Sequence, residues 1–265
     1  MFQTKEAQSL RILNTIFFVL MILANILVES LPLNNITTAQ VSTRNDTILT
    51  PTGITFAIWG VIYVWLFLFI LYQNGIFLKK GEGDNPDIVH AVSIFFIVSS
   101  ALNIAWLIAW HYEYVTLCFI LIFAMWVTLL FAHGRLLKEM SNRRQRFFAR
   151  IPFSIYLAWI SVAMALNFIA MLKHEVPDLL GISETVWGAA LVIIIFFLSE
   201  FFLMRYRDYA FTLTILWALS GILYRYAVEL SKQTLQVNLL LMLAVAMGVL
   251  IISLLISIGV QRLKT

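Results

Sequence analysis

The sequence carries little charge. Only 12% of its 265 residues are Asp, Glu, Lys or Arg, whereas 62% are hydrophobic. A soluble domain has about twice that share of charged residues, so the composition excludes an ordinary soluble protein. Together with a mean hydropathy of +0.91, it predicts an all-α, polytopic integral membrane bundle.

Cysteine and histidine are also scarce. A single cysteine, Cys118, excludes an internal disulfide and any CxxC motif for metal or redox chemistry. Its place in an apolar run predicts a small core residue. The four histidines lie near the ends of different apolar segments, so we expect no shared metal site and no bound cofactor. They are His90, His111, His133 and His174.

The motifs of common enzymes are absent as well. The sequence has no G-x-S-x-G, no H-E-x-x-H, no P-loop and no dinucleotide-binding fingerprint. A conventional hydrolase, kinase or dehydrogenase is therefore not expected. The net charge of +4 does not indicate nucleic acid as a partner, because the basic residues lie beside apolar segments and serve as topology signals.

Eight apolar segments have the length of a membrane-spanning helix. They cover residues 10–30, 52–74, 90–110, 112–134, 150–172, 186–206, 208–228 and 236–260. With a cytoplasmic N-terminus, fourteen of the 18 Lys and Arg residues fall on the cytoplasmic side, so we expect both termini there. The first segment also allows an interpretation as a signal peptide, although Asn14, Asn25 and Glu29 interrupt it and no clean cleavage site follows.

The fifth segment carries a polar and aromatic stripe. At about 100° per residue, six side chains share one side of the helix. They are Pro152, Tyr156, Trp159, Ala163, Asn167 and Ala170. A hydroxyl and an amide need partners in hydrocarbon, so this side should face other helices or a cavity.

The second and third segments carry similar stripes. These are Phe56, Trp59, Gly60, Tyr63 and Phe67 on the second, and Ser99, Asn103, Trp106 and Trp110 on the third. Gly60 is expected to let a helix or a flat ligand come close, and Trp110 to anchor the helix at the membrane interface. From these residues alone, the three stripes fit a ligand cavity walled by rings as well as plain helix packing.

Three motifs resemble the TspO/MBR family of tryptophan-rich sensory or translocator proteins. Residues 59–63 read WGVIY, residues 102–106 read LNIAW, and residues 156–167 read YLAWISVAMALN. The resemblance covers about residues 10–172. It divides the chain into a five-helix bundle at residues 1–172 and a three-helix membrane extension at residues 173–265.

The resemblance implies a pocket for a flat hydrophobic ligand such as a tetrapyrrole or a sterol, closed by the first loop. The site residues that it implies are Trp59, Tyr63, Asn103, Trp106, Tyr156, Trp159, Ala163 and Asn167. Trp59 and Trp159 would stack on the ligand, and the two tyrosines would complete the wall. The asparagines would hold helices together. Weak porphyrin breakdown is implied by the resemblance only.

The motif on the second segment, around Trp59, departs from the family pattern, which leaves the shape of the pocket open. Phe56 lies one residue closer to Trp59 than in the family, and Ala57 and Ile58 replace the usual prolines. The extension beyond residue 172 is a further departure. The expected partners are the bilayer and a small hydrophobic ligand, without nucleic acid, and a homodimer is compatible with this interpretation.

Two other interpretations remain. A secondary transporter for a small solute would use all eight helices and would need an ionisable group within the membrane, for which Glu200 is the candidate. Glu200 is, however, expected to form a salt bridge with nearby Arg205 or Arg207, or to extend its carboxylate to the membrane interface. The other interpretation is a membrane scaffold without a ligand.

Overall fold

The computed structural model describes residues 2–31, 33–76, 86–139, 142–176, 178–229 and 237–262. Within these ranges every regular element is helical, and eight helices are long and apolar enough to cross a membrane. The predicted all-α, eight-span fold is therefore confirmed. Four basic residues of the charge asymmetry, Lys79, Lys80, Lys232 and Lys264, lie outside the described residues.

Two of the ten α-helices are short connectors and the other eight are the spans. In chain order they are α1 (Phe2–Ser30), α2 (Thr38–Arg44), α3 (Ile58–Gln73), α4 (Pro86–His111), α5 (Val115–Glu139), α6 (Arg143–Gln145), α7 (Ile151–Glu175), α8 (Glu184–Tyr206), α9 (Tyr209–Tyr224) and α10 (Val237–Arg262). A 3₁₀ turn, η2 (Gly53–Ala57), precedes α3, and a π-helical turn, η5 (Arg225–Glu229), follows α9.

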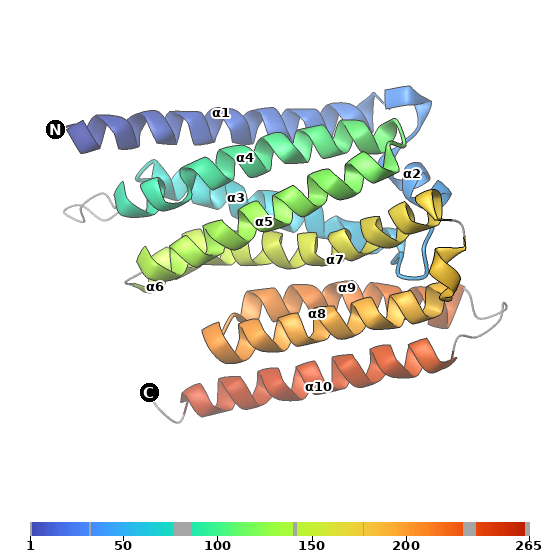
Figure 1. Cartoon of the computed structure of the whole chain (residues 1–265). Helices are drawn as coiled ribbons and strands as arrows, with labels where there is room; N and C mark the ends of the chain where they lie inside the picture. Colours follow the sequence, from blue (N-terminus) through green and yellow to red (C-terminus); the bar gives the residue numbers. More distant parts are fainter. Residues whose placement is uncertain are drawn as a thin grey trace.

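The spans form two groups (Figure 1). Helices α1, α3, α4, α5 and α7 make one bundle, and α8, α9 and α10 lie along one side of it, with α10 outermost. Helix α1 begins and α10 ends at the same end of the molecule, as an even number of spans requires. The cytoplasmic location of that end and the domain boundary at residue 172 stay predictions.

Helix α7 is the central element of the fold. It packs against α3, α5, α8 and α9, and most of its residues are buried, including the polar Ser154, Ser161 and Asn167. Ser161 accepts a hydrogen bond from Trp126 Nε1 at 2.9 Å and donates to the Leu157 carbonyl. The stripe predicted for this segment faces other helices and a cavity, as its polar groups require.

A buried ionic cluster joins the two groups of spans. One oxygen of Asp208, in the turn between α8 and α9, accepts hydrogen bonds from His133 Nε2 at 2.8 Å and from Ser154 Oγ at 2.6 Å. Arg150 Nη2 lies 3.3 Å from the same oxygen and donates to the Tyr206 carbonyl at 2.7 Å. The other Asp208 oxygen accepts from the first turn of α9. Asp208 thereby connects α5, α7 and α9.

Two expectations for the second segment were wrong. A Cβ at Gly60 would meet nothing within 4 Å, so this glycine does not mark a close approach. Phe67 is 48% exposed and stacks on Phe18 with ring centroids 6.1 Å apart, away from the other members of its stripe. The α-helix begins only at Ile58, after η2, so Phe56 is not part of the same helix as Trp59 and Tyr63.

The salt bridge expected for Glu200 was also wrong. Its side chain lies on the buried face of α8, is 7% exposed, and has no hydrogen-bond partner for either carboxyl oxygen among the described residues. Arg205 is exposed and lies over the Tyr206 ring instead. A buried carboxyl without a partner destabilises the fold.

Replacing this carboxyl with an apolar group should therefore stabilise the protein. We expect Glu200→Leu to raise the free energy of unfolding by about 1–3 kcal/mol, because the cost of desolvating the carboxyl disappears. Thermal unfolding of the purified protein measures this change. Glu139→Leu, at an exposed glutamate near the end of α5, is the control and should change the same quantity by less than about 0.5 kcal/mol. A loss of stability in Glu200→Leu would show that the carboxyl has a stabilising partner.

Candidate functional site

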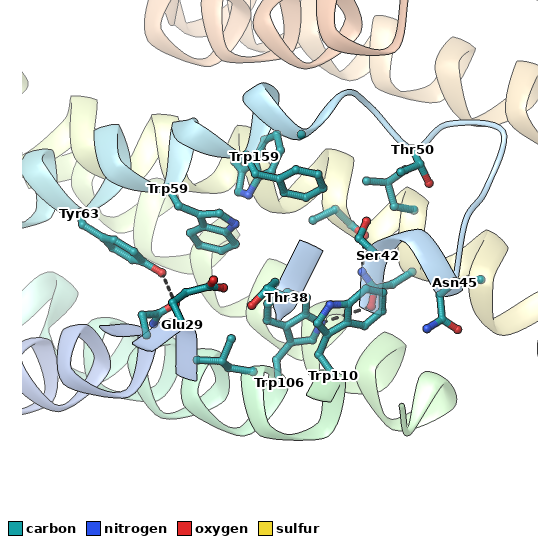
Figure 2. Close-up of a pocket in the computed structure, with 18 of the residues that line it drawn as sticks. Glu29, Thr38, Ser42, Asn45, Thr50, Trp59, Tyr63, Trp106, Trp110 and Trp159 are labelled. Carbon is teal, nitrogen blue, oxygen red and sulfur yellow. Dashed lines mark hydrogen bonds between the residues drawn. The ribbon is translucent and has the colours of Figure 1, made fainter. Parts of the chain in front are cut away.

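A cavity of about 570 Å³ lies between α1, α3, α4, α7 and the first loop. This volume falls within the range of small-molecule sites, roughly 300–1,000 Å³. Its wall includes a group of aromatic rings (Figure 2). The rings that line it are Phe56, Trp59, Tyr63, Trp106, Trp110 and Trp159.

Trp59 is the centre of the aromatic wall. Its ring is stacked on Tyr63 with centroids 5.7 Å apart, and it lies 6.3 Å from Trp106. Trp159 meets Trp59 nearly at a right angle, 82°, at 6.1 Å. Rings that contact one another edge to face and offset hold each other in place, so the wall is preformed without a ligand.

Trp110 belongs to this wall, and its predicted role as an interface anchor was wrong. It is 8% exposed and stacks on Trp106 at 5.7 Å, with 17° between the ring planes. The helical spacing of four residues from Trp106 to Trp110 indicated the shared face. The position near the end of the segment suggested the interface instead.

A chain of hydrogen bonds connects the five helices beside the cavity. Tyr63 OH donates to Asn25 Oδ1 at 2.8 Å, and Asn25 Nδ2 donates to Asn103 Oδ1 at 3.0 Å. Asn103 Nδ2 then donates to Tyr156 OH at 3.3 Å, and Tyr156 OH donates to Met125 Sδ at 3.1 Å. In order, the chain passes through α3, α1, α4, α7 and α5, and it fixes these helices relative to one another.

Six of the eight predicted site residues line the cavity and two do not. The six are Trp59, Tyr63, Trp106, Trp159, Ala163 and Asn167. Asn103 and Tyr156 are almost fully buried and lie behind the wall, in the hydrogen-bond chain. Asn167 holds helices together as expected, because its oxygen accepts from Trp106 Nε1 at 3.3 Å, and it also contributes to the cavity wall.

The sequence prediction missed the polar part of the cavity. The end of α1 contributes Asn25 and Glu29, and the first loop contributes several hydroxyl and amide side chains. The loop residues are Thr38, Ser42, Asn45, Thr47 and Thr50. Asn25 and Glu29 are four residues apart and therefore share a helix face, which is a signal that the sequence did contain.

The first loop is held in place by the C-terminal helices. Arg225, at the end of α9, pairs with Asp46 at 2.6 Å and donates to the Thr50 carbonyl at 2.8 Å. Tyr226 OH donates to the Ile48 carbonyl at 2.7 Å, and Glu184 accepts from the Ile48 backbone N–H. The part of the loop that lines the cavity is therefore positioned by α8, α9 and the turn after α9.

A second contact between loop and extension is steric. The backbone of Gly221 on α9 is so close to η2 that a Cβ there would lie 2.7 Å from Thr55 Cγ2. Thr52 N–H donates to the Gly221 carbonyl at 3.3 Å, and Trp217 Nε1 donates to the Thr55 carbonyl at 2.9 Å. Only glycine allows this approach of α9 to the loop.

One comparison with known proteins found a relationship. A family model described as TSPO-like protein matches residues 11–259. Neither a curated protein nor a solved structure matches the chain significantly. The matched range contains the cavity, the first loop and the greater part of α10.

Proposed function

Because the chain belongs to the family of TSPO-like proteins, we propose that it binds a flat hydrophobic ligand in the cavity between α1, α3, α4 and α7. The observation that carries this proposal is the wall of six aromatic rings around about 570 Å³. Rigid rings offer a large apolar surface at a low entropic cost, and a few polar groups can orient the bound molecule. Transport and sensing would both begin with this binding step.

The tryptophan rings give a direct test. Trp159 is 1% exposed and its Nε1 has no hydrogen-bond partner among the described residues, so Trp159→Phe removes ring area without breaking a hydrogen bond. We expect both Trp159→Phe and Trp59→Phe to weaken binding about three- to tenfold, because each removes an aromatic contact with the ligand. The measurement is a titration of the purified protein with pyrenemethanol, a sterol and protoporphyrin, followed by quenching of tryptophan fluorescence.

Trp65→Phe is the matched control. Trp65 is on the same helix as Trp59 but packs against Phe147 outside the cavity. The Trp65→Phe variant should therefore bind all three probes with the affinity of the wild type. If the wild type and all three variants show the same weak, unsaturable quenching, the cavity is not a binding site, and the interpretation as a scaffold gains support.

The transporter interpretation has a separate test. Glu200 does not line the cavity, and the described structure offers no contact between the two. Glu200→Gln should therefore leave ligand binding unchanged under our proposal. A secondary transporter coupled through this carboxyl would lose uptake in the same variant.

A further inference from the structure

The cavity has an uneven distribution of charge. Among the described residues that line it, Glu29 is the only one with a charged side chain at neutral pH, and no Lys, Arg or His is present. Figure 2 labels Glu29 among the residues that line the cavity. Glu29 lies in the last turn of α1 and is exposed, and no described residue pairs with it.

The basic residues around the first loop are already paired with acids. Arg44 contacts Glu113 at 2.9 Å, and Arg225 contacts Asp46 at 2.6 Å. Lys173 lies 3.2 Å from Glu184. A ligand carboxylate that entered the cavity would therefore meet Glu29 and would find no unpaired base in the described wall.

A cavity lined by tryptophan rings and a carboxylate favours cations. The face of an aromatic ring carries negative potential, and Trp attracts a cation more strongly than Tyr or Phe. Here Trp59, Trp106, Trp110 and Trp159 surround one cavity, and Glu29 adds a full negative charge at its edge. Both contributions have the same sign, so both favour a cation over an anion.

We propose that the cavity selects a flat apolar ligand that carries a protonated amine or a quaternary ammonium group, with the cation held between Glu29 and the tryptophan rings. This inference rests on the proposed function and specifies the class of ligand. The same site disfavours dianionic ligands such as protoporphyrin, because like charges repel and the carboxylates lose water without gaining a partner.

Three probes with one ring system separate charge from shape. Pyrenemethylamine is cationic near neutral pH, pyrenemethanol is neutral, and pyreneacetate is anionic. Each is titrated into the purified full-length protein in an uncharged detergent, with energy transfer from tryptophan to pyrene as the readout. We expect the cation to bind about tenfold more tightly than the alcohol, and the anion to bind more weakly than both.

Glu29→Gln assigns the preference to a residue. It should remove most of the advantage of pyrenemethylamine over pyrenemethanol, so that the ratio of the two affinities falls toward one. Glu6→Gln is the matched control, since it removes the same charge from an exposed position at the other end of α1. It should leave all three affinities as in the wild type.

The outcomes distinguish this inference from the proposed function. If the three probes bind with equal affinity in the wild type, or if Glu29→Gln keeps the full preference for the cation, the inference is wrong while the binding site stands. If no probe binds the wild type, the proposed function fails as well. If Glu6→Gln lowers the affinity for the cation as much as Glu29→Gln does, the preference reflects the overall charge of the protein, and the assignment to Glu29 is overturned.

Discussion

Asp208→Ala is expected to cause the largest loss of stability, about 3–5 kcal/mol in the free energy of unfolding, because it takes the shared acceptor from Arg150, His133 and Ser154. Asp208 is 4% exposed and accepts from His133, Ser154 and Arg150. It also caps α9 through Phe211 N–H. Thermal or denaturant unfolding in detergent measures the loss.

Two variants and a pH series complete this test. Asp208→Asn keeps the acceptor for the α9 cap but removes the charge, so its loss should be smaller. Asp87→Ala, at an exposed acid in the first turn of α4, should cost less than about 1 kcal/mol. Equal losses in Asp87→Ala and Asp208→Ala would contradict the role of the cluster.

The contribution of Asp208 should also depend on pH. Burial raises the pKa of its carboxyl, but the hydrogen bond from His133 and the charge of Arg150 outweigh burial, so the pKa lies below the usual 3.8. Because the pKa is lower in the folded state, the ionised carboxyl makes its full contribution to stability above the pKa of the unfolded state, about 3.9. That contribution is lost as the pH falls through the pKa of the folded state. The difference between wild type and Asp208→Ala should therefore shrink only in strong acid.

Gly221→Ala is expected to lower the affinity for pyrenemethanol about tenfold, which corresponds to about 1.4 kcal/mol of lost contacts with the ligand. A new methyl group at an overfilled contact costs about 1–3 kcal/mol, and the chain relieves this strain by moving η2. The methyl would overlap the Thr55 side chain and push η2 away from α9. Gly53 and Phe56, which line the cavity, lie in that turn. The titration used for the tryptophan variants measures the change.

Gly248→Ala provides the control for this variant. Gly248 is in the middle of α10, and a Cβ there would meet nothing within 4 Å. It should leave binding unchanged and should stabilise the helix by about 0.5–1 kcal/mol. The double variant Gly221→Ala with Thr55→Gly should recover part of the affinity, since it removes the side chain that the new methyl overlaps. Wild-type affinity in Gly221→Ala alone would show that α9 does not position the loop.

Local patterns in the sequence were sufficient to predict the spans and the side chains that share a helix face, whereas a cavity between those faces was implied by the family resemblance. Runs of apolar residues determine the number of helices. Helical periodicity places Trp59 and Tyr63 on one face of the second segment, and Trp159, Ala163 and Asn167 on one face of the fifth. All five residues line the cavity. These predictions depend on spacing along a single helix, which the sequence contains directly.

Contacts between distant segments could not be predicted in this way. The pairing of Arg225 with Asp46, and the approach of Gly221 to Thr55, join residues more than 160 positions apart in the chain. Asp208 was missed because its partners come from α5 and α7. Glu200 was assigned to nearby arginines because they are close in sequence, whereas the phase of α8 buries its side chain.

The hydrogen-bond chain from Tyr63 to Met125 runs in a single direction. Each hydroxyl or amide donates a hydrogen bond to the next group, and the Met125 thioether at the end only accepts. A molecule that drew the Tyr63 hydroxyl toward itself would take this donor from Asn25 Oδ1, while the three later bonds would keep their donors and acceptors. The link to α3 could therefore change without loss of the contacts that join α1, α4, α7 and α5.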